Sequence, residues 1–199
     1  MKFRIQFRIK LKTNHKKNRP HFFMIREEWL TQEWTKHDVY EFRKNSKVSN
    51  VFLCTTRFNN KTYAENRNAC KRLNLKCFYS NPYVLPQHIP QGATVYVLEM
   101  NNEENKIMGI GKIQNYLQMD VYRVYENDFY NQMYFAGNER IRCDTLHEEQ
   151  KQFICALERL CFYGRTHLKR GHRMTCFPIK TLGLCQRNEL DILDRISEM

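Results

Sequence analysis

The sequence predicts an α+β protein in which a small, strongly bent β-barrel is flanked by helices and preceded by a basic N-terminal extension. Three observations support this prediction. Residues 93–115 form two strands that are apolar on both faces, as in sheets that are buried on both sides. Gly109 and Gly111 alternate along the second strand, and glycines there permit a sharp coil or a close approach by another backbone or a ligand. The first twenty residues contain no acidic side chain.

The composition is that of a basic chain that can form a core. Its 199 residues suit one ordinary domain with extensions, and 42% of them are hydrophobic. The net charge of +12 favours polyanionic partners, with nucleic acid first and anionic lipid or an acidic protein second. A solubility device, or a lineage bias toward lysine, is the alternative. The sequence shows neither a long apolar run nor a signal peptide, so we expect a cytoplasmic protein with no membrane partner.

The N-terminal extension contains a strand, a loop and a broken helix. Residues 2–12 alternate apolar with mostly cationic side chains, which predicts a half-buried strand. Residues 13–20 form a basic loop. Residues 22–44 have helical periodicity with an interruption, after which Thr35 and Asp38 form a capping box for a second helix.

A domain border is predicted where the polar residues 46–50 interrupt this pattern. The extension then covers residues 1–48, and the barrel with its C-terminal helix and loop covers residues 49–199. We expect Trp29 and Trp34 to pack the extension against the barrel, although a binding role for them is the alternative.

The first half of the main domain alternates strands and a helix. Residues 51–55 are a short apolar strand. Thr62 and Glu65 form a capping box that opens a helix. Residues 76–79 are a brief strand, and residues 81–92 hold three of the five prolines, which predicts a rigid loop.

The two strands of residues 93–115 form a hairpin around a polar turn at 101–105. In the first strand, Val95 and Val97 point to one face. The opposite face carries Tyr96, Leu98 and Met100.

The C-terminal part is predicted to contain further strands, a long helix and a closing helix. The strands are placed at 121–125, 129–135 and 141–143, with a tight turn at Gly137–Asn138 before the last. Thr145 and Glu148 form a capping box for a helix that ends before Gly164. A basic loop at 165–180 and an amphipathic helix at 188–197 follow.

The eight cysteines include no CxxC pair, so we expect reduced thiols that act as small core residues. His167, His172 and Cys176 lie close in sequence, but their spacing matches no common zinc pattern. No metal and no cofactor are therefore predicted. The segment 109–112, GIGK, is too short for a phosphate-binding loop, and no nucleophile elbow appears, so the sequence favours a protein without catalytic residues.

The strongest candidate for a binding site is the segment 165–173, RTHLKRGHR, in which no acid interrupts the cations. Such a segment can follow a phosphate backbone, with lysine as a point charge and arginine as a bidentate donor. A solvated loop at the end of a helix is the alternative. The predicted nucleic-acid contacts are Lys16, Lys17, Arg19, Tyr63, Tyr96, Lys112, Arg165, His167, Lys169, Arg170, His172 and Arg173.

Tyrosines are frequent among the predicted strands and loops. Any two that line a groove beside basic residues would form a stacking site for unpaired bases, although core packing explains most of them individually. The candidates are Tyr63, Tyr79, Tyr83, Tyr96, Tyr116, Tyr122, Tyr125, Tyr130 and Tyr134.

The order of these elements resembles the PUA-like superfamily, especially its EVE, ASCH and YTH branches. The resemblance covers about residues 51–143 and rests on the segments QGATV at 91–95 and GIGKI at 109–113. It implies a small bent barrel that binds RNA or a modified base in a pocket. The downstream segments FYNQMYFAGNERI and GRTHLKRGH resemble proteins of large cytoplasmic DNA viruses.

These observations favour a nucleic-acid-binding protein that holds RNA or another single strand. Lys169, Arg170 and Arg173 would contact phosphates, and a tyrosine-lined groove near the strand of Gly109 and Gly111 would hold a base. Two alternatives stay open. One is a viral structural or assembly protein that contacts genome, capsid or host protein partners, and the other is a nucleoside hydrolase or nuclease of ASCH type.

Overall fold

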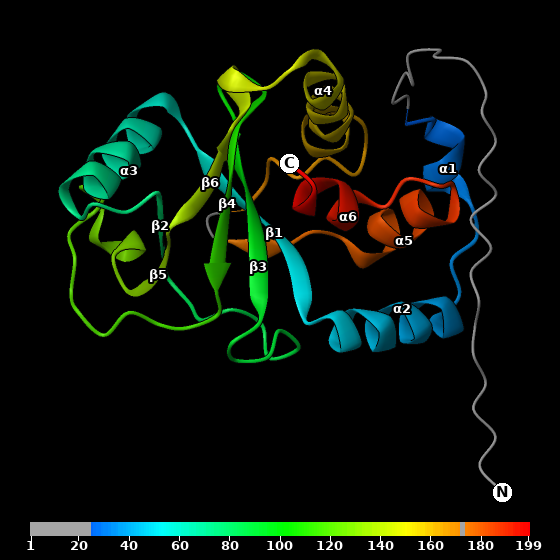
Figure 1. The fold of residues 1–199 in the computed structure, drawn as a ribbon, viewed down its shortest axis with the longest axis horizontal. Helices are drawn as coiled ribbons and strands as arrows, with labels where there is room; N and C mark the ends of the chain where they lie inside the picture. The colour runs from blue at the N-terminus through cyan, green and yellow to red at the C-terminus, as the bar shows by residue number, and fades with distance from the viewer. Residues whose placement is uncertain (1–24, 172–173) are drawn as a thin grey trace, which may run out of the picture.

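The computed structural model describes residues 25–171 and 174–199, which form a mixed α+β fold (Figure 1). The strand predicted at 2–12 and the basic loop predicted at 13–20 lie outside the described residues. The elements in chain order are α1 (Glu27–Thr31), α2 (Lys36–Ser49), β1 (Val51–Phe58), α3 (Asn60–Arg72), β2 (Cys77–Asn81), β3 (Thr94–Asn101), β4 (Lys106–Gln114), η1 (Asp128–Tyr130), β5 (Met133–Gly137), β6 (Glu139–Arg142), η2 (Cys143–Thr145), α4 (Glu148–Phe162), β7 (Thr175–Cys176), α5 (Ile179–Arg187) and α6 (Ile192–Ser197).

Five strands form the main sheet in the order β6-β4-β3-β1-β7. β3 and β4 are the predicted hairpin and pair antiparallel, whereas β1 and β3 run parallel because α3 and β2 lie between them in the chain. β2 and β5 form a separate antiparallel pair. Figure 1 shows α3 and this pair on one side of the main sheet, with α5 and α6 on the other.

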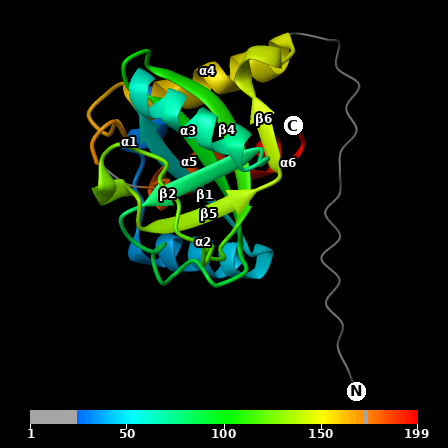
Figure 2. The ribbon, with the colours of Figure 1, turned by 90° about the vertical axis from the view of Figure 1, so that its left-hand side faces the viewer.

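A corner between β5 and β6 connects the two sheets. β5 pairs with β2, and after Asn138 the chain continues as β6, which pairs with β4. A Cβ atom on Gly137 would lie 2.0 Å from the carbonyl oxygen of Lys112, so only glycine fits at this corner. The tight turn predicted at Gly137–Asn138 is therefore a bend from one sheet into the other, and β2 and β5 cross the face of the main sheet (Figure 2).

The sheets curve toward each other but do not form a continuous ladder. The backbone N–H of Met174, just before β7, donates to Oδ1 of Asn81, the last residue of β2, at 2.8 Å. No strand pairing joins β2 to β7 in the part of the chain that the structure describes. A closed barrel is thus not found there, whereas the α+β class is confirmed.

β3 separates two cores. Val95 and Val97 lie with residues of β2, β5 and α3 in one core, which we call the strand-side core. Tyr96, Leu98 and Met100 lie with residues of α4, α5 and α6 in the helix-side core. The alternation of faces predicted for this strand is confirmed.

α3 and α4 begin at caps other than those predicted. The Asn59 side chain accepts a hydrogen bond from the backbone N–H of Thr62 at 2.7 Å, and Thr62 Oγ1 accepts one from the N–H of Asn59 at 3.0 Å. His147 caps α4 in the same reciprocal way with Gln150. Thr62 therefore lies inside the first turn of α3, and Thr145 lies in η2 before α4 begins.

The predicted interruption of the N-terminal helix is confirmed. Thr35 N–H donates to Asp38 Oδ2 at 2.8 Å, and Asp38 N–H donates to Thr35 Oγ1 at 3.2 Å, so the capping box forms at the start of α2. The helical pattern was expected to end before residue 46, but α2 continues to Ser49.

Both tryptophans are packing residues. A Cβ atom on Gly183 of α5 would lie 2.0 Å from the Trp34 ring, so glycine admits the indole here. The Arg187 guanidinium lies 5.0 Å from the centre of the same ring, a cation–π contact. Trp29 packs against the helix-side core. The packing is as expected, but Trp34 contacts a helix instead of the strands.

Several other segments differ from the prediction, among them 129–135, where Asp128–Tyr130 forms η1 and β5 begins only at Met133. Residues 121–125 form no strand, because Asn131 Oδ1 accepts hydrogen bonds from two backbone N–H groups there, each at 3.0 Å. The stretch 165–180 includes β7 and the start of α5, and only the second part of 188–197 is helical. Among the described residues, no helix has the length and apolar character needed to cross a membrane.

Candidate nucleic-acid interface

The basic segment is held against the end of β1 and the turn of the β3–β4 hairpin. Leu168 N–H donates to the carbonyl oxygen of Cys161 at 2.7 Å, which folds the chain back after α4. Arg57 Nε donates to the carbonyl oxygen of Leu168, and Asn102 Nδ2 donates to that of Lys169 at 3.0 Å. The backbone of the segment is therefore fixed by Arg57 of β1 and by Asn102 in the turn of the β3–β4 hairpin.

The cationic side chains of the segment differ in their exposure and in their hydrogen-bond partners. Arg165 and Arg170 are exposed. Lys169 Nζ donates to Asn105 Oδ1 at 2.8 Å, a neutral acceptor that leaves the lysine charge uncompensated. His167 is half-buried, and its Nδ1 has no hydrogen-bond partner among the described residues. The other two predicted contacts in this segment, His172 and Arg173, lie outside the described residues, as do Lys16, Lys17 and Arg19.

A cavity of about 440 Å³ opens beside this segment, and we call it the loop-side cavity. Gly171 of the basic segment borders it, and the start of α3 contributes Asn59 and Thr62. Tyr125 and Tyr130 form another wall, with their rings edge to face and 6.2 Å between centres. The cavity thus combines aromatic surface with amide and hydroxyl groups, which is the chemistry that holds an unpaired base.

A second cavity, of about 680 Å³, lies along another side of α3, and we call it the charged cavity. Its wall includes six cationic side chains and three carboxylates. The cations are Arg67, Lys71, Lys106, Arg140, Arg142 and Lys151, and the carboxylates are Glu104, Asp144 and Glu158. Neither Lys71 nor Lys151 forms an ion pair with a described residue. The surplus of positive charge suits a phosphate-bearing ligand.

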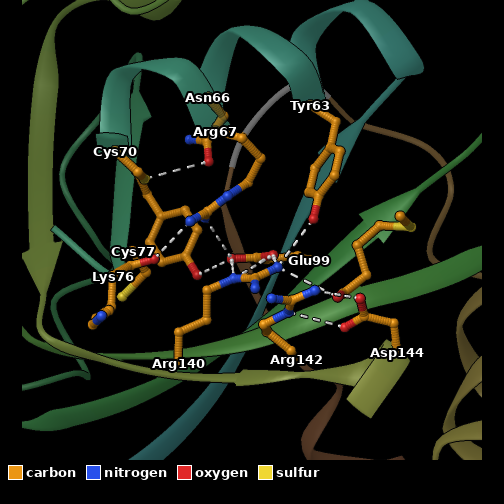
Figure 3. Close-up of polar contacts among 12 residues, drawn as sticks. Tyr63, Asn66, Arg67, Cys70, Lys76, Cys77, Glu99, Arg140, Arg142 and Asp144 are labelled. Atoms are coloured by element: carbon orange, nitrogen blue, oxygen red, sulfur yellow. Dashed lines mark hydrogen bonds and ion pairs between the residues drawn. The ribbon is translucent and has the colours of Figure 1, made fainter. Parts of the chain in front are cut away.

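Beneath the charged cavity lies a buried ion pair (Figure 3). The Glu99 side chain is fully buried, and Arg140 Nε donates to its two carboxylate oxygens at 2.9 and 3.1 Å. Tyr79 Oη donates to Glu99 Oε1 at 2.8 Å. Arg67 points at the same carboxylate, with Nη1 3.8 Å from Oε1. This Nη1 atom is buried without a hydrogen-bond partner in the described chain.

The ionisation of this cluster follows from its burial. Burial, together with the neighbouring Glu99 carboxylate, raises the pKa of Tyr79 well above its usual value. Tyr79 therefore stays protonated and can only donate to the carboxylate. Hydrogen bonds and charge attraction from Glu99 outweigh the opposing effect of burial and raise the pKa of Arg140. Arg140 therefore keeps its positive charge at physiological pH.

The two glycines of β4 make room for this cluster. A Cβ atom on Gly109 would lie 2.4 Å from Arg140 Nη2, and one on Gly111 would lie 1.9 Å from Tyr79 Oη. The close approach predicted at these positions is therefore made by side chains of the same protein.

The remaining predicted contacts lie in three different environments. Tyr63 lines the charged cavity, and its Oη accepts a hydrogen bond from Arg140 Nη2 at 3.0 Å. Tyr96 is buried in the helix-side core and borders a small cavity there, but it lines neither of the two cavities beside α3. Lys112 donates to both carboxylate oxygens of Glu139, at 3.0 and 2.9 Å, which compensates its charge.

The charged cavity is the part of the site that the sequence did not reveal. Its cations come from α3, the hairpin, β6 and α4, which are distant in the chain. One signal was available, because a glutamate at position 99 interrupts an apolar strand, and a buried carboxylate requires a cationic partner. The identity of that partner, Arg140, depends on how β6 pairs with β4.

No candidate metal centre is present in this part of the chain. No group of three or more histidine, cysteine, aspartate or glutamate side chains among the described residues could hold a metal ion. All eight cysteines are described, and all are free thiols.

Comparison with known proteins does not assign a family. The chain matches no protein-family model and no curated protein sequence. The site is therefore interpreted from its own geometry, namely two cavities on either side of α3, one aromatic and bordered by the basic segment, the other rich in cations.

Proposed function

We propose that the protein binds single-stranded nucleic acid, with RNA preferred to duplex DNA, by holding a base in the loop-side cavity and phosphates on the basic segment. The observation that carries this proposal is the position of Gly171. It places the basic segment at the border of a cavity whose wall includes Tyr125 and Tyr130. A strand that follows the basic segment would therefore meet stacking surface at the same cavity.

A base in the loop-side cavity would find both stacking and hydrogen-bonding groups. Tyr125 is buried, and Asn66 Nδ2 donates a hydrogen bond to its hydroxyl at 3.3 Å. Its fixed ring supports the ring of the partly exposed Tyr130. Stacking on an aromatic ring requires an unpaired base, which favours a single strand over a duplex. The amide of Asn59 and the hydroxyl of Ser80 also line the cavity.

Phosphates would be attracted by the cationic side chains around the basic segment. Arg165 and Arg170 are exposed on the basic segment. The N-terminus of α3 opens at the same cavity, but the Glu103 carboxylate accepts the N–H of Asn60 there at 3.0 Å, so the attraction of phosphate rests on the side chains. The charged cavity would receive a neighbouring phosphate on the other side of α3.

This function agrees with a PUA-like arrangement of the strands. The support is the corner at Asn138 and the Asn81–Met174 hydrogen bond, which together bring β2 toward β7 in a barrel-like curve. A protein of this kind would act in the cytoplasm, where RNA is available. The viral or assembly alternative predicts a stable protein partner and no base pocket.

The test is a titration of fluorescently labelled single-stranded RNA, with an RNA duplex and a DNA duplex beside it, at several salt concentrations. We expect single-stranded RNA to bind most tightly and its affinity to fall steeply with salt, because each neutralised phosphate releases counterions. The double variant Arg165→Gln, Arg170→Gln should make the slope of log K against log salt shallower by about 1.4, or about 0.7 per phosphate contact.

Lys36→Gln, at an exposed position on α2, is the matched control and should leave the slope unchanged. A response to salt that is flat in the wild type, or equal binding of all three nucleic acids, would contradict the proposal. Capture of one protein partner with no measurable RNA binding would favour the assembly alternative instead.

A further inference from the structure

A third cavity lies on the opposite side of the molecule from α3, between α2, the β1–β7 edge of the main sheet and the proline-rich loop. Its volume is about 780 Å³, and we call it the thiol-side cavity. Cys176 of β7 and His88 of the proline-rich loop both line it, with Cys176 Sγ 3.4 Å from His88 Nε2. The proposed nucleic-acid interface uses neither residue.

A second cysteine lies directly behind Cys176. Cys54 of β1 and Cys176 of β7 are paired across two antiparallel strands. Phe177 N–H donates to the carbonyl oxygen of Leu53 at 2.8 Å, and these residues flank the cysteine pair. The two cysteines therefore occupy a non-hydrogen-bonded position of the ladder, where opposed Cα atoms lie about 4.5 Å apart. Disulfides span Cα separations of roughly 4.4–6.8 Å, so a bond fits without moving the strands.

The two thiols are chemically unequal. Cys54 is fully buried, whereas Cys176 is partly exposed at the cavity. A hydrogen bond from the Cys54 thiol lowers the pKa of Cys176, and the same bond, together with burial, raises the pKa of Cys54. Cys176 is thus the nucleophile of the pair, since the thiolate is the reactive form.

No other cysteine in the chain combines these features. Burial raises the pKa of Cys77 to about 12 and that of Cys185 to about 11, so both remain protonated and inert. Cys155 is exposed, but its pKa is raised by partial burial and by nearby glutamates. Cys155 therefore serves for comparison as an accessible thiol that is not activated.

We propose that Cys176 is a peroxide-reactive thiol and that Cys54 resolves it to a reversible disulfide between β1 and β7. The thiol-side cavity admits the peroxide to Cys176, and His88 lies where it can exchange a proton with that sulfur. This proposal is independent of the nucleic-acid function, because it rests on a different cavity and on different strands.

The steps balance with a peroxide as the oxidant. The Cys176 thiolate attacks one peroxide oxygen, the O–O bond breaks, and the leaving oxygen takes a proton and departs as water or an alcohol. The Cys54 sulfur then attacks the sulfenic acid at Cys176, and the hydroxyl group leaves with the Cys54 proton as water. Two thiols are oxidised and one peroxide is reduced, and an added dithiol reverses the change.

The experiment is peptide mapping of the full-length protein after treatment with a small excess of hydrogen peroxide, with remaining thiols blocked by N-ethylmaleimide. We expect a cross-linked peptide that contains Cys54 and Cys176, lighter by two hydrogen atoms and lost after dithiothreitol. Cys176→Ser should abolish it. His88→Gln should slow its formation roughly tenfold or more, in the range of a lost proton-transfer group.

Cys54→Ala should leave a sulfenic acid on Cys176 that dimedone labels, and Cys155→Ser, the matched control, should change neither product nor rate. The wild-type map decides the pairing even if the variant at the buried position 54 does not fold. Peroxide-dependent loss of thiols spread over Cys155 and other cysteines, without the Cys54–Cys176 peptide, would overturn the proposal.

Discussion

The two faces of β3 differ near the end of the strand, where one buries only apolar side chains and the other buries a carboxylate. On the helix side, Leu98 and Met100 are inaccessible among apolar neighbours. On the other side, Glu99 is equally inaccessible, but it is held by Arg140 and Tyr79 beneath a cavity rich in cations. Apolar burial needs no specific partner, whereas a buried carboxylate is tolerated only while every partner stays in place. Substitutions of the residues that hold Glu99 should therefore change both the stability of the sheet and the wall of the charged cavity.

Arg140→Met should give the largest effect. Removal of the guanidinium leaves Glu99 buried with only the more distant Arg67, whose Nη1 lies 3.8 Å from Oε1, and the free energy of unfolding should fall by about 3–5 kcal/mol. The measurement is urea denaturation followed by circular dichroism. The double variant Glu99→Leu, Arg140→Met should recover most of that loss, because it removes both charges together.

Arg142→Met is the control for this comparison. Arg142 lies on the same strand and pairs with Asp144 at the surface, where water screens the contact, so its loss should not measurably change the unfolding curve. If Arg140→Met were as neutral as Arg142→Met, the ion pair would not contribute to stability as argued here.

Tyr79→Phe should have a smaller effect and one that depends on pH. At neutral pH the variant loses a hydrogen bond to a charged group, which contributes about 1.5–3 kcal/mol. In the wild type the pKa of Tyr79 is raised by folding, so the unfolded chain deprotonates first, near pH 10. The free energy of unfolding should therefore fall as the pH rises above about 10.

Denaturation midpoints at neutral and alkaline pH test this prediction. Tyr79→Phe should show a weaker decline above pH 10 than the wild type, because the residue that titrates is gone. Tyr116→Phe, at a half-exposed position, should decline as the wild type does. A decline that is equal in all three proteins would assign the alkaline sensitivity to other groups.

The sequence predicted those parts of the fold that depend on a pattern within one strand or helix. It did not predict those that depend on contacts with residues elsewhere in the chain. The alternation of Val95 and Val97 with their neighbours has a period of two and placed both faces of β3 correctly. The caps were misplaced because Asn59 lies three residues before Thr62, and both residue types can cap a helix. The strand expected at 121–125 does not form, because two backbone N–H groups of this segment donate to the side chain of Asn131 and not to a neighbouring strand.

The same distinction holds for the site. The cations of 165–173 are contiguous, so their clustering was visible in the sequence. The Tyr125–Tyr130 wall and the meeting of Arg67 with Arg140 depend on how α3 packs over β4 and β6, which no local pattern contains. Likewise, nothing in the spacing of Cys54 and Cys176 indicated that β7 returns to pair with β1.

Tyr130→Ala tests base stacking in the loop-side cavity separately from phosphate contacts. The variant should weaken single-stranded RNA binding by about 1–3 kcal/mol, the usual contribution of one stacked base. The slope against salt should not change, because no phosphate contact is lost. Tyr130→Phe keeps the ring and should bind almost as the wild type does. Equal loss in both variants would assign the effect to the hydroxyl and not to stacking.

Lys71→Gln with Lys151→Gln should give the smallest effect and decides whether the charged cavity belongs to the interface. Both lysines line that cavity without ion pairs to described residues, so they are available to phosphate. If the strand crosses α3, the salt slope should become shallower by up to about 1.4 with the same base preference.

Lys36→Gln with Lys180→Gln removes the same charge from exposed positions on α2 and α5 and is the matched control. A slope that changes only in the first double variant would extend the interface across α3, from the loop-side cavity to the charged one. If the two double variants behave alike, the charged cavity attracts the strand only through the net charge of the protein. The surplus of cations above Glu99 would then be a consequence of stabilising the buried carboxylate, because Arg67 and Arg140 both point at it from that wall.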